Sequence, residues 1–273
     1  MIPRIHLPSL AERLHPDALP ASVAPLPLDE PAAHHLLRVL RRQSGDEVEV
    51  FDGQGLACRA EIASTRPATV RLLARLPAEP APRVALVLAQ CLSSAEKMDW
   101  TIEKAVELGV SRIVPLLSAR SVVKLDASRA ERRLQHWQRL VVAAAMQCGR
   151  NRLPEVSAAQ PLRAWLDALP PPEAHEQRWV LSPEAPHSLV NRAHAASGGT
   201  TAAWLLCGPE AGLAPEELAQ AQARGWTPAL LGPRVLRTET AGLVGLTVLQ
   251  ATLGDLGDEA DLDNETASTG PSA

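Results

Sequence analysis

The chain has 273 residues, of which 46% are hydrophobic and 21% are charged, and its formal net charge is −4. These values are typical of a folded protein with one or two domains. The longest apolar runs are too short to span a bilayer and the N-terminus lacks a signal-peptide segment, so we expect a cytoplasmic protein without a membrane partner. The four cysteines are widely spaced and form no CxxC pair, so the sequence predicts neither a disulfide framework nor a metal site.

The charge is unevenly distributed along the chain. From Asp255 onward there are six acidic residues and no basic one, whereas the rest of the chain has 27 basic residues against 25 acidic ones. We expect the acidic tail, residues 256–273, to be disordered. Between Arg120 and Arg152, eight basic residues stand against two acidic ones. This basic belt either attracts phosphate groups or forms the solvated face of a helix, and charge alone leaves both interpretations open.

Residues 1–76 contain short alternating segments at 4–7, 47–51, 56–62 and 69–73, separated by turn-forming residues. This pattern predicts a small β-barrel domain. One helix, expected over Pro31–Arg42, interrupts the strands. Its basic side chains suit either an RNA-contacting helix or an ordinary surface helix. The candidate RNA-binding residues on it are His35, Arg38, Arg41 and Arg42.

Residues 77–82, Pro-Ala-Glu-Pro-Ala-Pro, predict a stiff linker. Beyond it, over 83–255, strands alternate with helices, which predicts a mostly parallel sheet covered by helices on both faces. We expect Ser93 or Ser94 to cap the first helix and Gly109 to end it. The six tryptophans are expected mainly in the core rather than at base-stacking positions. The expected strands are 83–90, 113–117, 179–181, 203–207 and 228–231, and the expected helices are 94–108, 128–148, a helix beginning at 215, and 240–253.

Two of the late strands end in glycine loops. Residues 205–213 read Leu-Leu-Cys-Gly-Pro-Glu-Ala-Gly-Leu, and residues 230–241 read Leu-Leu-Gly-Pro-Arg-Val-Leu-Arg-Thr-Glu-Thr-Ala. In open α/β sheets ligands bind outside the carboxyl ends of strands, and glycine lets the backbone approach them closely. The chain contains neither GxGxxG after its first long strand nor GxxxxGK[ST], so a common dinucleotide or P-loop site is not predicted.

The two loops resemble the paired signature of the RsmE methyltransferases, which belong to the SPOUT class of trefoil-knotted, AdoMet-dependent enzymes. Residues 97–110, residues 145–154 and residues 35–53 are similar to three further segments of that family, and the match covers about residues 1–255. Two departures are mild. Ala211 stands where the family usually has glycine, which is tolerable if its φ is negative. Leu213 stands in place of the usual aromatic residue.

The resemblance implies an α/β fold in which a PUA-like RNA-binding β-barrel precedes a knotted, AdoMet-binding parallel-sheet domain. It also implies a homodimer that methylates N3 of one uridine in 16S ribosomal RNA within the small ribosomal subunit. A ribose 2′-O-methyltransferase of the same class and a non-catalytic RNA-binding protein are the alternatives. Carried over to this chain, the residues expected to bind AdoMet are Leu181, Ser182, Pro183, Leu206, Cys207, Gly208, Pro209, Glu210, Gly212, Leu231, Gly232, Val235, Leu236 and Thr240.

Methyl transfer to N3 requires orientation of donor and acceptor and removal of the N3 proton. Arg237 and Arg234 are expected to stabilise the developing uridinate, and Glu239 is the candidate base. Alternatively, Glu239 favours the start of the last helix, with Thr238 as its N-cap. Arg237 could likewise form an ion pair with Glu210 or Glu239.

RNA contacts are expected mainly from arginine, because the chain has one phenylalanine and no tyrosine. Glu107, Gln147 and Arg150 either line the substrate side of the pocket or pair with one another. Outside the first domain, the candidate RNA-binding residues are Arg120, Lys124, Gln147 and Arg150.

Overall fold

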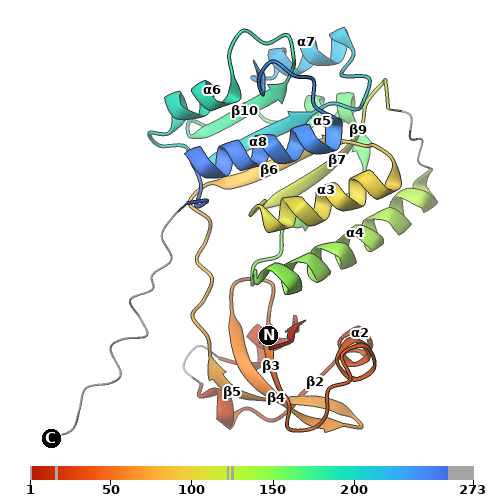
Figure 1. The fold of residues 1–273 in the computed structure, drawn as a ribbon, viewed down its shortest axis with the longest axis vertical. Coiled ribbons are helices and arrows are strands. Elements are labelled where there is room, and N and C mark those ends of the chain that lie inside the picture. Colours follow the sequence, from red (N-terminus) through yellow and green to blue (C-terminus); the bar gives the residue numbers. More distant parts are fainter. Residues whose placement is uncertain (1, 16–17, 122, 124–125, 258–273) are drawn as a thin grey trace, which may run out of the picture.

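The structure is a computed structural model that describes residues 2–15, 18–121, 123 and 126–257. The predicted acidic tail lies outside these residues from residue 258 onward, and Lys124 also lies outside them. Figure 1 shows an N-terminal sheet below a larger α/β assembly, connected by the segment that follows β5. Among the described residues, no helix is both long and apolar enough to cross a bilayer.

The N-terminal part is a five-stranded sheet in the order β1-β3-β4-β5-β2. Alternate residues such as Val48, Val50 and Ile62 are buried in one apolar cluster, which explains the alternating sequence. Within the described residues the edge strands β1 and β2 do not pair, so the expected barrel is a half-barrel. Both edges are short, and Pro27 in β2 has no N–H to donate. The strands are β1 (Arg4–His6), β2 (Leu26–Pro27), β3 (Glu47–Phe51), β4 (Ala57–Thr65) and β5 (Ala68–Arg75).

The helix predicted over Pro31–Arg42 is shorter and less regular than expected. It begins as α2 (Glu30–His34), where the Asp29 carboxylate accepts a hydrogen bond from the Ala32 N–H (2.8 Å). It continues as a π-helical turn, η2 (His35–Val39), and stops before Arg41, whose φ is +54°. Two other short helical segments of this part are α1 (Leu10–Arg13) and η1 (Pro20–Ser22).

The C-terminal part confirms the predicted alternation of strands and helices. Its main sheet runs in the order β12-β10-β11-β6-β7-β8, with β9 also paired to β7, and these neighbouring strands are parallel. The strands are β6 (Ala85–Cys91), β7 (Arg112–Leu117), β8 (Glu155–Val156), β9 (Gln160–Pro161), β10 (Glu176–Leu181), β11 (Ala202–Cys207) and β12 (Thr227–Ala229). The helices are α3 (Ala95–Glu107), α4 (Ala127–Cys148), α5 (Leu162–Ala168), α6 (Leu189–Ala196), α7 (Pro215–Ala223) and α8 (Thr238–Thr252).

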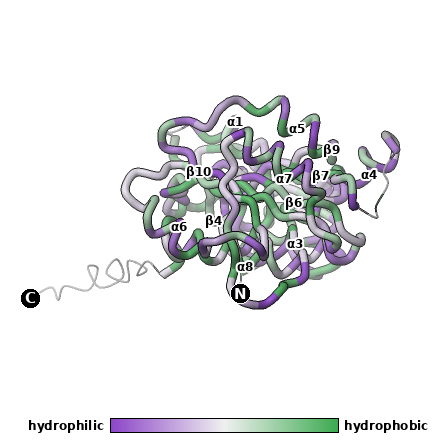
Figure 2. Tube along the Cα trace, turned by 90° about the horizontal axis from the view of Figure 1, so that it is seen from above, coloured by the Kyte–Doolittle hydropathy of each residue, from purple (hydrophilic) through white to green (hydrophobic). Residues whose placement is uncertain are grey.

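Helices cover both faces of this sheet. Leu86, Leu88 and Leu205 belong to the cluster that also contains apolar residues of α3, α4, α6 and α8. The alternate residues Val87 and Ala89 point to the opposite face, in the cluster that contains residues of α5 and α7. Because both faces are buried, the strands read as continuous apolar runs. Figure 2 shows the corresponding pattern, with mostly green segments in the middle of the molecule.

The ends of α3 match the prediction only in part. Ser94 is the N-cap residue, but its side chain makes no capping hydrogen bond. Gly109 follows the helix with a φ of +77°, as expected of a glycine stop. Most tryptophans are buried or partly buried in the core, as predicted, whereas Trp100 on α3 is 44% exposed.

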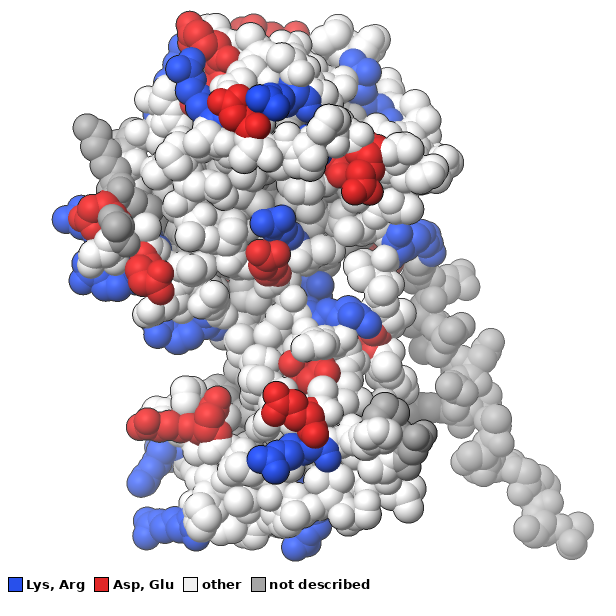
Figure 3. All heavy atoms as spheres, turned by 180° about the vertical axis from the view of Figure 1, so that it is seen from behind, with Lys and Arg blue, Asp and Glu red and all other residues white. Residues whose placement is uncertain are grey.

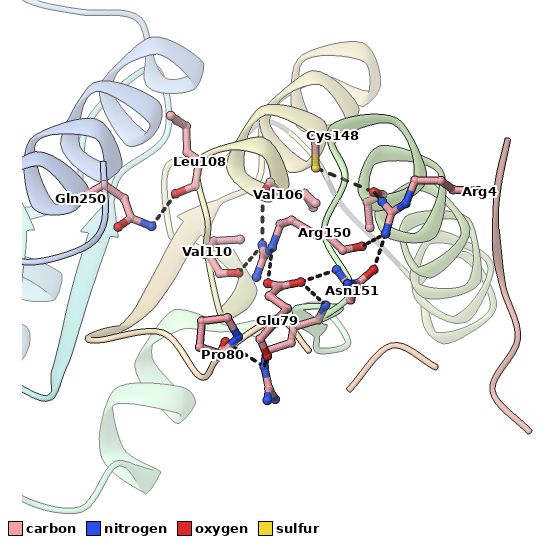
Figure 4. A network of polar contacts seen from close by, with 12 residues as sticks. Arg4, Glu79, Pro80, Val106, Leu108, Val110, Cys148, Arg150, Asn151 and Gln250 are labelled. Carbon is pink, nitrogen blue, oxygen red and sulfur yellow. Dashed lines mark hydrogen bonds and ion pairs between the residues drawn. The ribbon is translucent and has the colours of Figure 1, made fainter. Parts of the chain in front are cut away.

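Arginine side chains connect the two parts of the molecule (Figure 4). Arg4 on β1 donates hydrogen bonds to the carbonyl of Ala145 (3.0 Å), the carbonyl of Arg150 (3.3 Å) and the Asn151 side chain, and pairs with Glu49 (3.2 Å). These partners lie in β3, at the end of α4 and in the loop after it. The guanidinium of Arg4 therefore fixes the half-barrel against the C-terminal part.

A second arginine stabilises the same joint. Arg150 donates to the carbonyls of Val106 (3.0 Å) and Val110 (2.9 Å), and its Nε lies 3.8 Å from the Glu79 carboxylate. Glu79 lies in the segment predicted to be a linker and also accepts hydrogen bonds from the N–H groups of Asn151 and Arg152. Figure 4 shows Arg150, Glu79 and Asn151 close together, with Glu79 between the other two. The segment is thus tied to the C-terminal part by specific hydrogen bonds.

Candidate active site

A candidate site lies at the carboxyl ends of β10, β11 and β12. These strands are parallel neighbours, so the loops that follow them meet at one edge of the sheet. Together they surround a cavity of about 780 Å³, which is within the usual size range of small-molecule sites. The lining residues that the sequence predicted to bind AdoMet are Leu181, Ser182, Pro183, Cys207, Gly208, Pro209, Glu210, Gly212, Leu231, Gly232, Val235 and Leu236.

Two predicted cofactor residues lie elsewhere. Leu206 is fully buried and packs in the cluster on the α5 and α7 face of the sheet. Alternation along β11 explains this, because consecutive residues of a strand point to opposite faces. Thr240 is the third residue of α8 and lines a second, adjacent cavity. Most of the predicted residues thus line one cavity, but the sequence did not show which way each side chain points, and AdoMet binding by these residues stays a prediction.

Glycine shapes the cavity through its backbone. A Cβ added to Gly208 would lie 3.1 Å from the N atom of Leu213, so a larger residue would crowd this loop. Gly212 and Gly232 have φ values of +69° and +117°, which disfavour other residues. Among the described residues Arg41 is the non-glycine residue with a positive φ, so Ala211 is unstrained. The departure from the family pattern at Ala211 therefore leaves the loop conformation intact.

The sequence left open the alternative that Thr238 caps α8, and this alternative is wrong. The N-cap residue is Arg237, and Thr238 is the first residue of the helix. Its hydroxyl donates to the carbonyl of Gly208 (2.5 Å) and accepts from the Gln90 side chain (2.9 Å). The hydroxyl is used by a loop 30 residues away, so it is not available to cap the helix. Thr238 therefore links the start of α8 to the first glycine loop.

Lys97 on α3 connects the first glycine loop to α8 electrostatically. Its ammonium lies 3.3 Å from the Glu210 carboxylate and 3.5 Å from the Glu239 carboxylate. The alternative ion pair of Arg237 with either glutamate does not form. Within the described residues, Arg234 and Arg237 have no ion pair or side-chain hydrogen bond, and both line the large cavity. Sequence reasoning missed Lys97 because its partners are more than 100 positions away.

Cys207 lies at the end of β11 and also lines the cavity. Burial raises the pKa of its thiol to about 11, opposed by a hydrogen bond with Thr238. The thiol is therefore neutral near pH 7 and is a poor nucleophile. Cys207 contributes packing to the cavity wall and not covalent chemistry.

A second, shallower and more open cavity of about 400 Å³ adjoins the first, between α3 and α8. Arg237 lines both cavities, so this residue lies where they meet. The second cavity brings together charged, hydroxyl and aromatic side chains from two helices. Its lining residues are Glu96, Lys97, Trp100, Arg237, Glu239 and Thr240.

Comparisons with known proteins agree with this geometry. The chain matches a family model described as an RNA methyltransferase domain over residues 79–250 and one described as an RNA methyltransferase PUA domain over residues 28–73. It is 32% identical to the ribosomal RNA small subunit methyltransferase E of Mycobacterium bovis, over 84% of this chain and 87% of that protein. The enzyme of the same name from a Buchnera aphidicola strain is 29% identical, over 84% and 91% of the two chains.

The chain belongs to the RsmE family of RNA methyltransferases. A solved structure supports the same assignment. The ribosomal RNA small subunit methyltransferase E of Neisseria gonorrhoeae, bound to S-adenosyl methionine, is 31% identical with a TM-score of 0.79. The alignment covers 93% of this chain and 99% of that one. The PUA-like half-barrel and the parallel-sheet methyltransferase domain are therefore features of the family, while the trefoil knot stays a prediction.

Several residues predicted to bind RNA have partners inside the protein. Arg120 donates to the carbonyls of Ala211 (3.2 Å) and Leu213 (3.3 Å) and lines the large cavity, so it supports the first glycine loop. Arg150 belongs to the joint between the two parts, away from the cavity, and pairs with neither Glu107 nor Gln147. Glu107 instead pairs with Lys104 (2.7 Å).

The other predicted RNA-binding side chains are accessible. Arg38 and Arg41 are exposed near the end of the π-helical turn, and His35 and Arg42 are half-buried. Gln147 is exposed on α4. On the face opposite to that of Figure 1, positive and negative side chains are interspersed and do not form one basic patch (Figure 3). RNA binding by these residues stays a prediction.

Proposed function

We propose that this chain is the AdoMet-dependent enzyme that methylates N3 of one uridine in 16S ribosomal RNA. The observation that supports it most directly is a glycine-walled cavity lined by Arg234 and Arg237, which have no ion pair with any residue that the structure describes. Family membership supports the substrate class, since the similar enzymes are named for methylation of small-subunit ribosomal RNA. We further propose that it works in the cytoplasm as a homodimer, on RNA within the small ribosomal subunit.

The large cavity suits AdoMet in size and in chemistry. Apolar side chains such as Leu181, Leu231 and Leu236 provide contacts for the flat adenine ring. The Gly208 and Gly232 loops expose backbone groups that a polar ligand requires. When bound, AdoMet supplies an activated methyl group on a sulfonium centre. The protein's task is then to hold the acceptor in line and to manage charge on the uracil ring.

Arg237 and Arg234 are suited to that second task. Loss of the N3 proton leaves negative charge on the uracil ring, and an unpaired guanidinium can donate to the carbonyl oxygens that share it. Because neither arginine is neutralised within the described residues, both donor sets are available for substrate. Glu239, buried in the first turn of α8, is the candidate acceptor of the proton.

The proposal is tested by isothermal titration with AdoMet and by nucleoside analysis of the product. Gly208→Trp should abolish AdoMet binding, because even a Cβ at that position is crowded by Leu213. Gly198→Trp is the matched control, since a Cβ there meets nothing within 4 Å. Digestion of methylated small subunits should release N3-methyluridine. Release of 2′-O-methylated nucleosides would favour a ribose methyltransferase, and AdoMet binding without methylation of any RNA would favour the non-catalytic alternative.

A further inference from the structure

The smaller cavity between α3 and α8 is not explained by AdoMet binding, since Arg237 is the one residue that lines both cavities. Its volume of about 400 Å³ is at the low end of the range for small-molecule sites. A methyltransferase needs its acceptor next to its donor, and this cavity shares a wall with the large one. The question is which chemical group its side chains would recognise.

Glu239 provides the first indication. The residue is 9% exposed, and its Oε2 atom is buried without a hydrogen bond, although the ammonium of Lys97 lies 3.5 Å away. Buried carboxylate oxygens are normally hydrogen-bonded, and Glu239 also lines the cavity, so its carboxylate favours a ligand that brings an N–H or O–H donor. Glu239 therefore selects for a hydrogen-bond donor.

Arg237 selects for the opposite property. Its guanidinium has five N–H donors, and within the described residues none has a protein partner. A ligand that lies between Arg237 and Glu239 must therefore present acceptors to one side and a donor to the other. The imide edge of uracil has this pattern, with the N3–H between two carbonyl oxygens. Cytosine carries a lone pair at N3, which the Glu239 carboxylate would repel.

Trp100 adds a surface for a flat ring. It is 44% exposed on α3, whereas Trp137, Trp165 and Trp226 are at most 6% exposed. Its place in the cavity lining makes part of the indole available to a ligand. Exposed aromatic faces next to a cationic side chain are common base-stacking platforms in proteins that bind single-stranded nucleic acid.

We propose that this cavity binds the acceptor uracil, flipped out of the RNA, with its ring on Trp100 and its imide edge between Arg237 and Glu239. The inference rests on the proposed function and identifies the acceptor site for it. In the reaction the N3 proton moves to Glu239 and the N3 electron pair forms the new bond to the methyl carbon. The carbon–sulfur bond breaks, and its electron pair stays on the sulfur of AdoMet. Flipping is required because N3 is inaccessible in a base pair.

The test compares Trp100→Ala, Trp100→Phe and Val190→Ala in the full chain, with unmethylated small subunits as substrate. Loss of the stacking surface should lower kcat/KM by roughly tenfold to a hundredfold, with AdoMet affinity unchanged. Trp100→Phe should recover most of the loss. Val190 on α6 is a similarly exposed apolar residue (41%) outside both cavities, and its variant should keep full activity.

A direct probe is small-subunit RNA in which 5-iodouridine replaces the methylated uridine. Irradiation should cross-link it to the peptide that contains Trp100. A cross-link only to other peptides, or wild-type kcat/KM in Trp100→Ala, would overturn the acceptor site while leaving the proposed function intact. A shift of Trp100→Ala to a smaller species in sedimentation velocity would place Trp100 between two copies and would also overturn it. Absence of methylation by the wild-type chain would instead contradict the proposed function.

Discussion

Two regions of the molecule concentrate arginines, and they use them in opposite ways. At the joint between the half-barrel and the sheet domain, Arg4 and Arg150 donate to backbone carbonyls and pair with Glu49 and Glu79. At the rim of the large cavity, Arg234 and Arg237 are exposed, and among the described residues neither has a partner. All four residues are arginines, so their residue type alone gives no reason to separate them.

The difference shows how the surroundings decide what an arginine does. A guanidinium whose donors are already bonded contributes to stability, and it costs free energy to redirect it to a ligand. A guanidinium without partners contributes little to the folded state and can bind a charge that develops during a reaction. We therefore expect substitutions at the rim to change catalysis and substitutions at the joint to change stability.

The largest expected effect is on catalysis at the rim. Arg237→Ala should lower kcat by about 10²–10³-fold, the typical cost of one donor that stabilises developing charge. Its melting temperature should match that of the wild type, because the Arg237 side chain makes no ion pair or hydrogen bond with the described part of the chain. Arg224→Ala, which removes an exposed ion pair with Asp167, is the control and should keep wild-type kcat. A stability loss in Arg237→Ala without a change in kcat would contradict the distinction between the two regions.

The next largest effect is on stability at the joint. Arg150→Ala removes two hydrogen bonds to carbonyls and leaves the Glu79 carboxylate without this cation, which should cost about 3 kcal/mol of the free energy of unfolding. Arg132→Ala, at an exposed position of α4, should change it by less than about 0.5 kcal/mol. Urea denaturation of both variants measures the difference. Wild-type stability in Arg150→Ala, with weaker RNA binding, would return this residue to the RNA-binding set.

The sequence predicted local features well and distant contacts poorly. The long apolar runs of β6 and β11 and the extent of α4 were predicted because strand and helix periodicity are properties of neighbouring residues. The role of Thr238 was mistaken because the carbonyl that accepts from it belongs to Gly208. The expected capping of α3 failed similarly, since Ser94 has the right position without the hydrogen bond.

The candidate site shows the same limit. The glycine loops were recognisable because a Gly-Pro turn directly follows an apolar run in the sequence, so the signal is local. The position of Lys97 between Glu210 and Glu239 depends on how α3 packs beside α8, and no local pattern encodes it. The exposure of Trp100 is another such case, because it contradicts the general tendency of tryptophan to be buried.

A smaller effect is expected from the link between α8 and the first glycine loop. Thr238→Val removes the hydroxyl that donates to the Gly208 carbonyl and accepts from Gln90. AdoMet affinity should fall about tenfold, as expected for the loss of one or two buried hydrogen bonds. Thr252→Val removes a hydroxyl bond to a carbonyl of the same helix and is the matched control. Equal AdoMet affinity in the two variants would show that the loop does not depend on Thr238.

The smallest expected effect is on the pH dependence of stability and concerns His6 on β1. Burial lowers the pKa of His6 below its usual value of 6.5, so folding favours the neutral ring. The stabilisation this provides is present above pH 6.5 and is lost as the pH falls through the lowered pKa. His6→Gln should flatten the dependence of unfolding free energy on pH in that window. Urea denaturation at several pH values measures this dependence. If the unfolding free energy of the variant changes with pH as much as that of the wild type, other groups cause the acid sensitivity.

The position of Arg237 on the wall between the two cavities has a thermodynamic consequence. A side chain shared by two sites makes the occupancy of each site part of the other's environment, which couples their binding free energies. Such coupling is reciprocal, so whatever factor AdoMet imposes on RNA affinity, RNA must impose on AdoMet affinity. The factor by which AdoMet changes RNA affinity should therefore equal the factor by which RNA changes AdoMet affinity when each is titrated in the presence of the other. Removing the guanidinium of Arg237 should bring this factor towards one.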